Sequence, residues 1–322
     1  MKKLLLSGSA LLLAGCLLFS LSCKKEAATT TPTTVTDDSQ AQQSNAADES
    51  SVGAESDQAV DDANNALSGT TFSGKTDWTL PICDATIMDS SSKSSNPYIL
   101  ITYNGNQCLG GKTRTGTIKI VRNGILLWKQ AGASFTLTLT NYKVTRIIDG
   151  KSFTFNGSKT ITNVSGGVIT DLFALTAPAT QIVHSVKGDL VLKFDADGTS
   201  RIWHVDRTRT YTKLAGTVTG VQISVTGNAS VNSLSNVVVW GTNRNNQTFY
   251  TQITTPLVIN SICGWSNPTS GVKVHTGPFK ELKVTFGLDS TGTSVTSGCA
   301  SSFKLNWTNA NGAAKIAVIS YK

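Results

Sequence analysis

The stretch FTLTLTNYKVTRIIDGKSFTFNGSKTIT, residues 135–162, decides the fold class. Its first part alternates phenylalanine and leucine with threonine, which is the two-residue period of a strand with one buried face. Asp149-Gly150 then separates this run from a second alternating run, and Asp-Gly is a strong signal for a hairpin turn. The stretch therefore predicts two antiparallel strands. The alternation slips after Leu139, which predicts a β-bulge near Asn141.

The chain from residue 71 onward repeats this pattern of alternating run, short polar turn and alternating run. We expect an all-β domain over residues 71–322, built as an antiparallel meander of roughly 12–14 strands that forms a sandwich, a half-barrel or a barrel. A helical turn is expected near Asp171–Ala174. Segments 82–120 and 262–307 each hold an Ile-Cys pair, an alternating strand and a second cysteine, which suggests an internal two-fold repeat.

The N-terminus predicts export and lipid attachment. Two lysines follow Met1, and an apolar run then extends to Ser22, so residues 1–22 are typical of a signal peptide. Cys23 ends the apolar run and is the favoured acylation site, although Cys16, preceded by Leu-Ala-Gly, fits the usual lipobox pattern better. Acyl chains on this cysteine would hold the protein on a membrane without a spanning segment.

Charge is distributed unevenly along the chain. The segment 23–70 carries nine acidic residues against Lys24 and Lys25, and it has almost no large apolar side chains. Such a composition predicts a disordered acidic tether, with only a short, marginal helix over Asp57–Leu67. The remainder of the chain is basic, which suits an anionic glycan or lipid or simply a soluble surface. Nucleic acid is not an expected partner of an exported protein that lacks a recognised binding module.

Four cysteines remain beyond the signal peptide and the acylation site. An even number in an exported protein predicts disulfides. The internal repeat favours Cys83–Cys108 and Cys263–Cys299, each closing a hairpin, while Cys83–Cys299 or Cys108–Cys263 is the alternative. A zinc site needs close ligand pairs such as C-x2-C, and the chain has none.

The sequence offers little catalytic chemistry. The body contains one glutamate, Glu281, so a paired-glutamate glycosidase is excluded. His204 and Asp206 share one strand face, which favours a polar surface pair over a hydrolytic site. The sequence from Asp195 to Gly198 resembles the start of a calcium loop but lacks its later ligands, so a hairpin turn is the better interpretation. We expect no catalytic residues, no metal and no cofactor.

One strand carries a more suggestive face. With a two-residue period, arginines and aromatic residues fall on one side of the strand at 201–213. This pattern is typical of a surface for an acidic glycan or a phosphate-bearing ligand, or of core aromatics with arginines at the sheet edge. The candidate residues are Arg201, Trp203, Arg207, Arg209 and Tyr211.

Several short motifs resemble those of uncharacterised all-β cell-envelope lipoproteins of the Bacteroidota. They are GKTRTGTIKIV, FTLTLTNYKV followed by SKTITN, DRTRTYT, and GTNRNNQTFYTQITTPLV before Ile262-Cys263. The chain departs from this pattern at residues 295–302. The resemblance implies an envelope lipoprotein and supplies no catalytic residues.

These observations together predict a lipid-anchored envelope protein, in the outer membrane, that acts as a binding or scaffolding module. The alternatives are a polysaccharide hydrolase that uses aspartates and a carrier of lipids or other apolar ligands. The carrier would need a concave apolar face about the width of an acyl chain. The sequence leaves the ligand, the membrane leaflet and the oligomeric state open.

Overall fold

The computed structural model describes residues 39–68, 82–90, 97–108, 111–176, 178–243, 245–264, 267–277, 281–309 and 311–321. The predicted signal peptide and both candidate acylation sites, Cys16 and Cys23, lie outside these residues.

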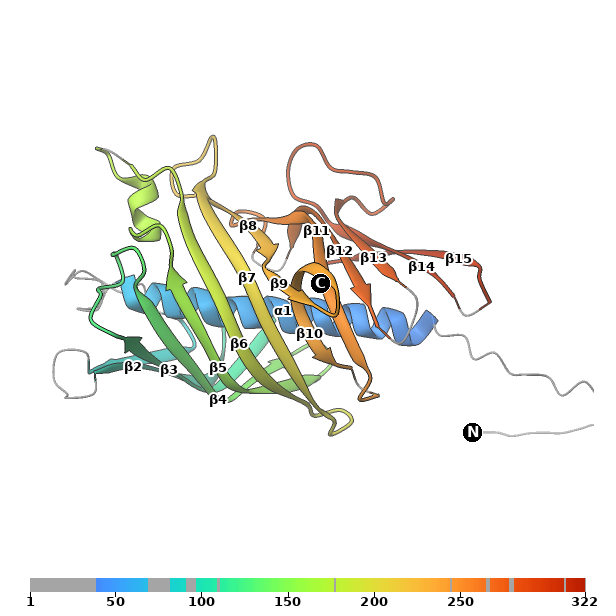
Figure 1. The fold of residues 1–322 in the computed structure, drawn as a ribbon, viewed down its shortest axis with the longest axis horizontal. Helices are drawn as coiled ribbons and strands as arrows, with labels where there is room; N and C mark the ends of the chain where they lie inside the picture. Colours follow the sequence, from blue (N-terminus) through green and yellow to red (C-terminus); the bar gives the residue numbers. More distant parts are fainter. Residues whose placement is uncertain are drawn as a thin grey trace, which may run out of the picture. The chain divides into compact units, whose positions relative to one another are not determined.

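The described residues form one helix, one 3-10 helix and fifteen strands (Figure 1). They are α1 (Ser39–Ser68), β1 (Ala85–Asp89), β2 (Tyr98–Gln107), β3 (Lys112–Asn123), β4 (Ser134–Arg146), β5 (Ser152–Asn163), η2 (Ile169–Phe173), β6 (Ile182–Phe194), β7 (Ser200–Lys213), β8 (Val221–Gly227), β9 (Ala229–Val231), β10 (Leu234–Thr242), β11 (Thr248–Asn260), β12 (Pro268–Thr276), β13 (Leu282–Leu288), β14 (Ser302–Thr308) and β15 (Ala314–Ser320).

All fifteen strands belong to a single antiparallel sheet, which confirms the predicted all-β meander. The strands follow chain order from β1 to β7 and from β10 to β15. Two short strands, β8 and β10, lie end to end between β7 and β11 in the sheet. Near one end β10 pairs with both β7 and β11, and near the other end β8 pairs with both. The sheet is strongly curved, and α1 lies along its concave side (Figure 1).

The stretch at 135–162 forms the predicted hairpin of β4 and β5. Gly150 has a φ of +66° in the connecting turn, a conformation that glycine adopts without steric cost. The predicted bulge is also present, because the pairing of β4 shifts register between Leu139 and Tyr142 and Asn141 has a φ of +46°. The helical turn expected near Asp171 is η2.

The prediction of a disordered tether over residues 23–70 is wrong for Ser39–Ser68, which form α1. The short helix expected over Asp57–Leu67 is present, but as part of this longer helix. This helix is thirty residues long and belongs to the same compact unit as the sheet. Val52, Val60 and Leu67 are fully buried, together with three alanines. The composition of this segment did not predict a long helix, because the segment itself has few large apolar side chains to bury. The sheet supplies charged partners that the segment alone does not reveal.

Candidate functional site

The predicted arginine face is real, but it points inward. Arg201, Arg207 and Arg209 lie on the buried, concave side of β7, and this side also carries Trp203, Val205 and Tyr211. Trp203 is buried with them and donates from Nε1 to the carbonyl oxygen of Thr242 at 3.2 Å. The face is therefore closed to an external glycan or lipid in this arrangement, which corrects the expectation of an exposed binding surface.

Carboxylates of α1 occupy the face instead. Asp48, Asp57 and Asp61 meet the three arginines in register along β7. The nitrogen-to-oxygen distances are 3.2 Å for Arg201–Asp48, 2.6 Å for Arg207–Asp57 and 2.9 Å for Arg209–Asp61. The helix therefore runs from the β6–β7 turn toward the β7–β8 turn.

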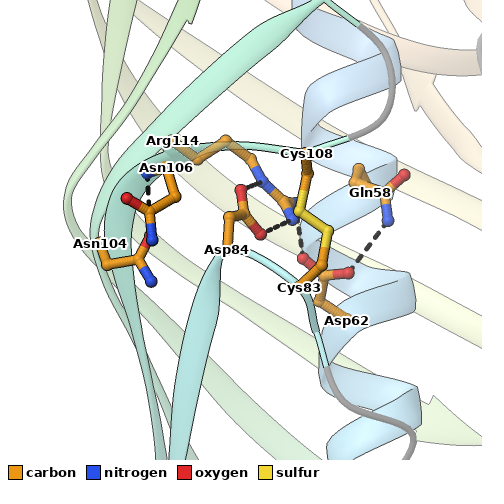
Figure 2. Close-up of a disulfide and its surroundings, with 8 residues drawn as sticks. All are labelled: Gln58, Asp62, Cys83, Asp84, Asn104, Asn106, Cys108 and Arg114. Carbon is orange, nitrogen blue, oxygen red and sulfur yellow. Dashed lines mark hydrogen bonds and ion pairs between the residues drawn. A yellow bond between two sulfur atoms is a disulfide. The ribbon is translucent and has the colours of Figure 1, made fainter.

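A second part of this interface lies at β3, where Figure 2 shows Arg114 between two carboxylates. Arg114 donates to Asp84 at 2.6 Å from Nε and at 2.5 Å from Nη2, and to Asp62 of α1 at 2.7 Å from Nη1. Tyr103 and Gln58 also donate to Asp62. A bidentate arginine pair of this kind fixes geometry more strongly than a single contact. Asp62 is therefore held from three directions.

The third part lies on β12. Lys273 Nζ is 3.0 Å from Glu49 Oε1, and His275 Nε2 is 3.2 Å from Glu49 Oε2. Burial acts to raise the pKa of Glu49, but Lys273 and His275 outweigh it and hold that pKa below its usual range. Burial lowers the pKa of His275 despite the neighbouring carboxylate.

Acidic and basic groups balance across the interface. Helix α1 contains six acidic residues and no lysine or arginine. The basic side chains that meet it or lie beneath it are Lys112, Arg114, Lys159, Arg201, Arg207, Arg209 and Lys273, while Asp84 adds one acid from the sheet side. Six acids plus Asp84 match seven cations, so the acidic segment and the basic body that the sequence shows are partners within one chain.

Lys159 differs from the other cations because it reaches the helix backbone. It is almost fully buried, and its Nζ donates to the carbonyl oxygen and the hydroxyl group of Ser56. Burial and the nearby Arg207 hold its pKa well below the usual value for lysine. No Cβ fits at the neighbouring Gly188, since it would lie 2.3 Å from the carbonyl oxygen of Ser158 and 2.8 Å from the Cγ atom of Lys159. The amine is enclosed by packing and is not open to a substrate.

Both favoured disulfide pairings are confirmed. Cys83–Cys108 links the segments that flank the β1–β2 hairpin, with 6.1 Å between the Cα atoms, and Cys263–Cys299 has 5.2 Å. The second bridge joins the end of β11 to the β13–β14 loop, so it does not close a simple hairpin as expected.

Within the described residues, Cys83, Cys108 and Asp84 are close enough to resemble a metal site. Both sulfur atoms are bonded to each other in the Cys83–Cys108 disulfide, and the carboxylate of Asp84 accepts hydrogen bonds from Arg114, so these groups are not free to bind a metal.

A cavity of about 450 Å³ opens where the N-terminal half of α1 meets the ends of the strands. Its apolar lining comes from two parts of the sheet, with Val144, Phe153 and Phe194 in β4–β6, and Phe303, Ile319 and Tyr321 in and just after β14 and β15. Small residues of α1, among them Ala47 and Ala54, form its floor. This volume is within the range of small-molecule sites, which are mainly apolar with a few polar groups.

The charged groups that line this cavity are already engaged. Glu55 accepts from Lys112 at 2.6 Å, and Asp48 lies against Arg201. Arg146 is paired with Asp149 at the mouth. The cavity therefore offers apolar and aromatic walls to a ligand rather than a pair of free carboxylates.

The remaining sequence candidates are surface features. His204 Nδ1 lies 2.5 Å from Asp189 on the neighbouring strand, so its partner is not Asp206. Asp206 pairs with Lys187 at 3.1 Å. Asp197 accepts from the backbone and hydroxyl of Thr199 in the β6–β7 turn, as the hairpin interpretation requires.

Sequence reasoning missed the cavity and the interface beneath α1. The signal for the interface was present, because nine acids and no bases followed Lys25 up to residue 70 while cations alternated on β7. The cavity had no comparable signal, because its walls come from strand ends far apart in the chain.

Comparison with protein-family models, with curated proteins and with solved structures finds no match for this chain. The resemblance to Bacteroidota lipoproteins therefore stays a prediction. Among the described residues, no helix combines the length and the apolar character needed to cross a membrane.

Proposed function

We propose that the protein is a cell-envelope lipoprotein, anchored through Cys23, that binds a partly apolar small molecule in the cavity beside α1. The cavity of about 450 Å³, lined by the aromatic residues Phe153, Phe194, Phe303 and Tyr321, is the observation that supports this function. It fits a carrier or binding module, which needs a concave and mainly apolar site with a few polar groups. The proposal assigns no catalytic residue.

The hydrolase alternative would require two carboxylates facing each other across the site. Asp48 and Glu55 line the cavity, but Arg201 and Lys112 already neutralise them. This pairing favours binding over catalysis.

The test uses the full chain with Cys16→Ser and Cys23→Ser, purified without detergent, and a neutral apolar dye such as Nile red. We expect saturable binding with a rise in dye fluorescence. Ala196→Trp places a large ring at the exposed rim of the cavity and should weaken binding about tenfold or more, because it occupies the entrance.

The matched control is Ala313→Trp, at an exposed position that does not line the cavity. It should bind the dye like the parent chain. Absence of saturable binding, or equal effects of the two tryptophans, would contradict the proposed function.

A further inference from the structure

The two ends of the sheet differ in charge. The turns β4–β5 and β6–β7 lie at one end and carry Arg146, Asp149, Lys151, Asp195 and Asp197. The connections β3–β4, β5–β6 and β7–β8 lie at the other end. Residues 124–133, 164–181 and 214–220 of these connections contain only two charged residues, Lys129 and Asp171. Asp171 is half-buried, and its carboxylate accepts from the backbone of Val168 at 2.8 Å.

These three connections also expose large aliphatic side chains. We call these five residues the apolar rim: Ile125, Leu126, Val164, Leu175 and Val218. Ile125 and Val218 are 87% and 83% exposed, so they are nearly as accessible as in an extended chain. Scattered exposed aliphatics are common on soluble proteins, but a group of them on adjoining loops with few charged residues marks an interaction site.

Contacts between the loops hold the rim together. Gly167 donates to the carbonyl oxygen of Lys129 at 2.8 Å, and Asn163 donates to that of Trp128 at 2.7 Å, which joins β3–β4 to β5–β6. Lys213, the last residue of β7, lies 6.0 Å from the ring centre of Phe173 in η2. The three loops therefore form one surface at this end of the sheet.

We propose that the apolar rim inserts into the surface of a lipid bilayer. Aliphatic side chains on loops with few charged residues fit the boundary between headgroups and acyl chains, since charged side chains are costly deeper in the bilayer. Lys129 and Lys213 flank the rim and suit anionic headgroups. This inference is independent of what the cavity holds.

The predicted anchor can reach the same membrane. Helix α1 runs toward the rim, and its thirty residues span about 45 Å at 1.5 Å per residue. The sixteen steps from Cys23 to Ser39 cover at most about 53–58 Å when extended. The acyl chains and the rim can therefore contact one bilayer at the same time.

The test measures co-sedimentation of the full chain, carrying Cys16→Ser and Cys23→Ser, with phosphatidylcholine vesicles that contain or lack phosphatidylglycerol. We expect binding that Ile125→Asp combined with Val218→Asp weakens about tenfold or more, because two buried aliphatic side chains are lost from the lipid phase. Each variant is first checked for an unchanged circular dichroism spectrum.

The matched control is Ile148→Asp. Ile148 is 86% exposed, like Ile125, but it lies in the β4–β5 turn at the opposite end of the sheet. It should leave vesicle binding unchanged. The inference is overturned if the parent chain does not bind either vesicle, or if Ile148→Asp weakens binding as much as the rim variant. Those results leave the dye test of the cavity unaffected.

Discussion

His184 lies between the rings of Trp128 and Tyr211, with ring centres 4.9 and 5.0 Å away, and it is almost fully buried. Burial, aided by the positive charge of Arg209, lowers its pKa to about 3. In the unfolded chain the pKa of a histidine is about 6.5. Below this pH the unfolded state therefore binds a proton at His184, whereas the folded state does not. The stability that this neutral ring contributes is present above about pH 6.5 and is lost as the pH falls toward 3.

His184→Phe should reduce this acid sensitivity. Between about pH 6 and pH 4.5 each such proton changes the free energy of unfolding by about 1.4 kcal/mol per pH unit, and the variant removes one proton. Urea denaturation at a series of pH values measures the slope. A residual slope of the same sign is expected from His275, whose pKa burial also lowers. Identical slopes for the two proteins would show that His184 does not remain neutral.

Among the helices and strands, α1 is the element whose full length the sequence did not predict. The period-2 pattern predicted β4 and β5, their turn and the bulge at Asn141, because those features depend on neighbouring residues. Helix α1 contains serine, asparagine, aspartate and Gly53, which are poor formers of isolated helices. Its order comes from contacts with strands far away in the chain. The same reason explains why the arginines of β7 were recognised as one face but not as buried.

Arg209→Met should test how α1 is held. Removing one member of a buried ion pair leaves the charge of Asp61 without its partner, so we expect a loss of about 3–5 kcal/mol in the free energy of unfolding. Arg209→Met with Asp61→Leu should lose much less, because no buried charge is then left unpaired. Chemical denaturation of the two single variants and the double variant measures the coupling.

Lys213→Met is the control for the Arg209 and Asp61 variants, since Lys213 lies on β7 like Arg209 but is exposed. It should change stability by no more than about 0.5 kcal/mol. Additive effects of Arg209→Met and Asp61→Leu would mean that the two side chains do not interact.

At the scale of the whole molecule, one sheet curves around one acidic helix (Figure 1). A cavity lies beside the N-terminal half of this helix. Charged turns surround the cavity end, and loops with few charged residues form the apolar rim at the other. The two disulfides restrain the sheet on either side of this arrangement, at β1–β2 and between β11 and the β13–β14 loop. Binding in the cavity and contact with lipid at the rim can therefore occur at separate ends.

The position of α1 within the concave side of the sheet underlies both proposals. Amide hydrogen exchange of the full chain, followed by mass spectrometry, measures it most directly. We predict slow exchange over Val52–Leu67, comparable to the central strands β4–β6, because these amides are hydrogen-bonded in a buried helix. Complete exchange of this segment within seconds, while the strands stay protected, would contradict the account.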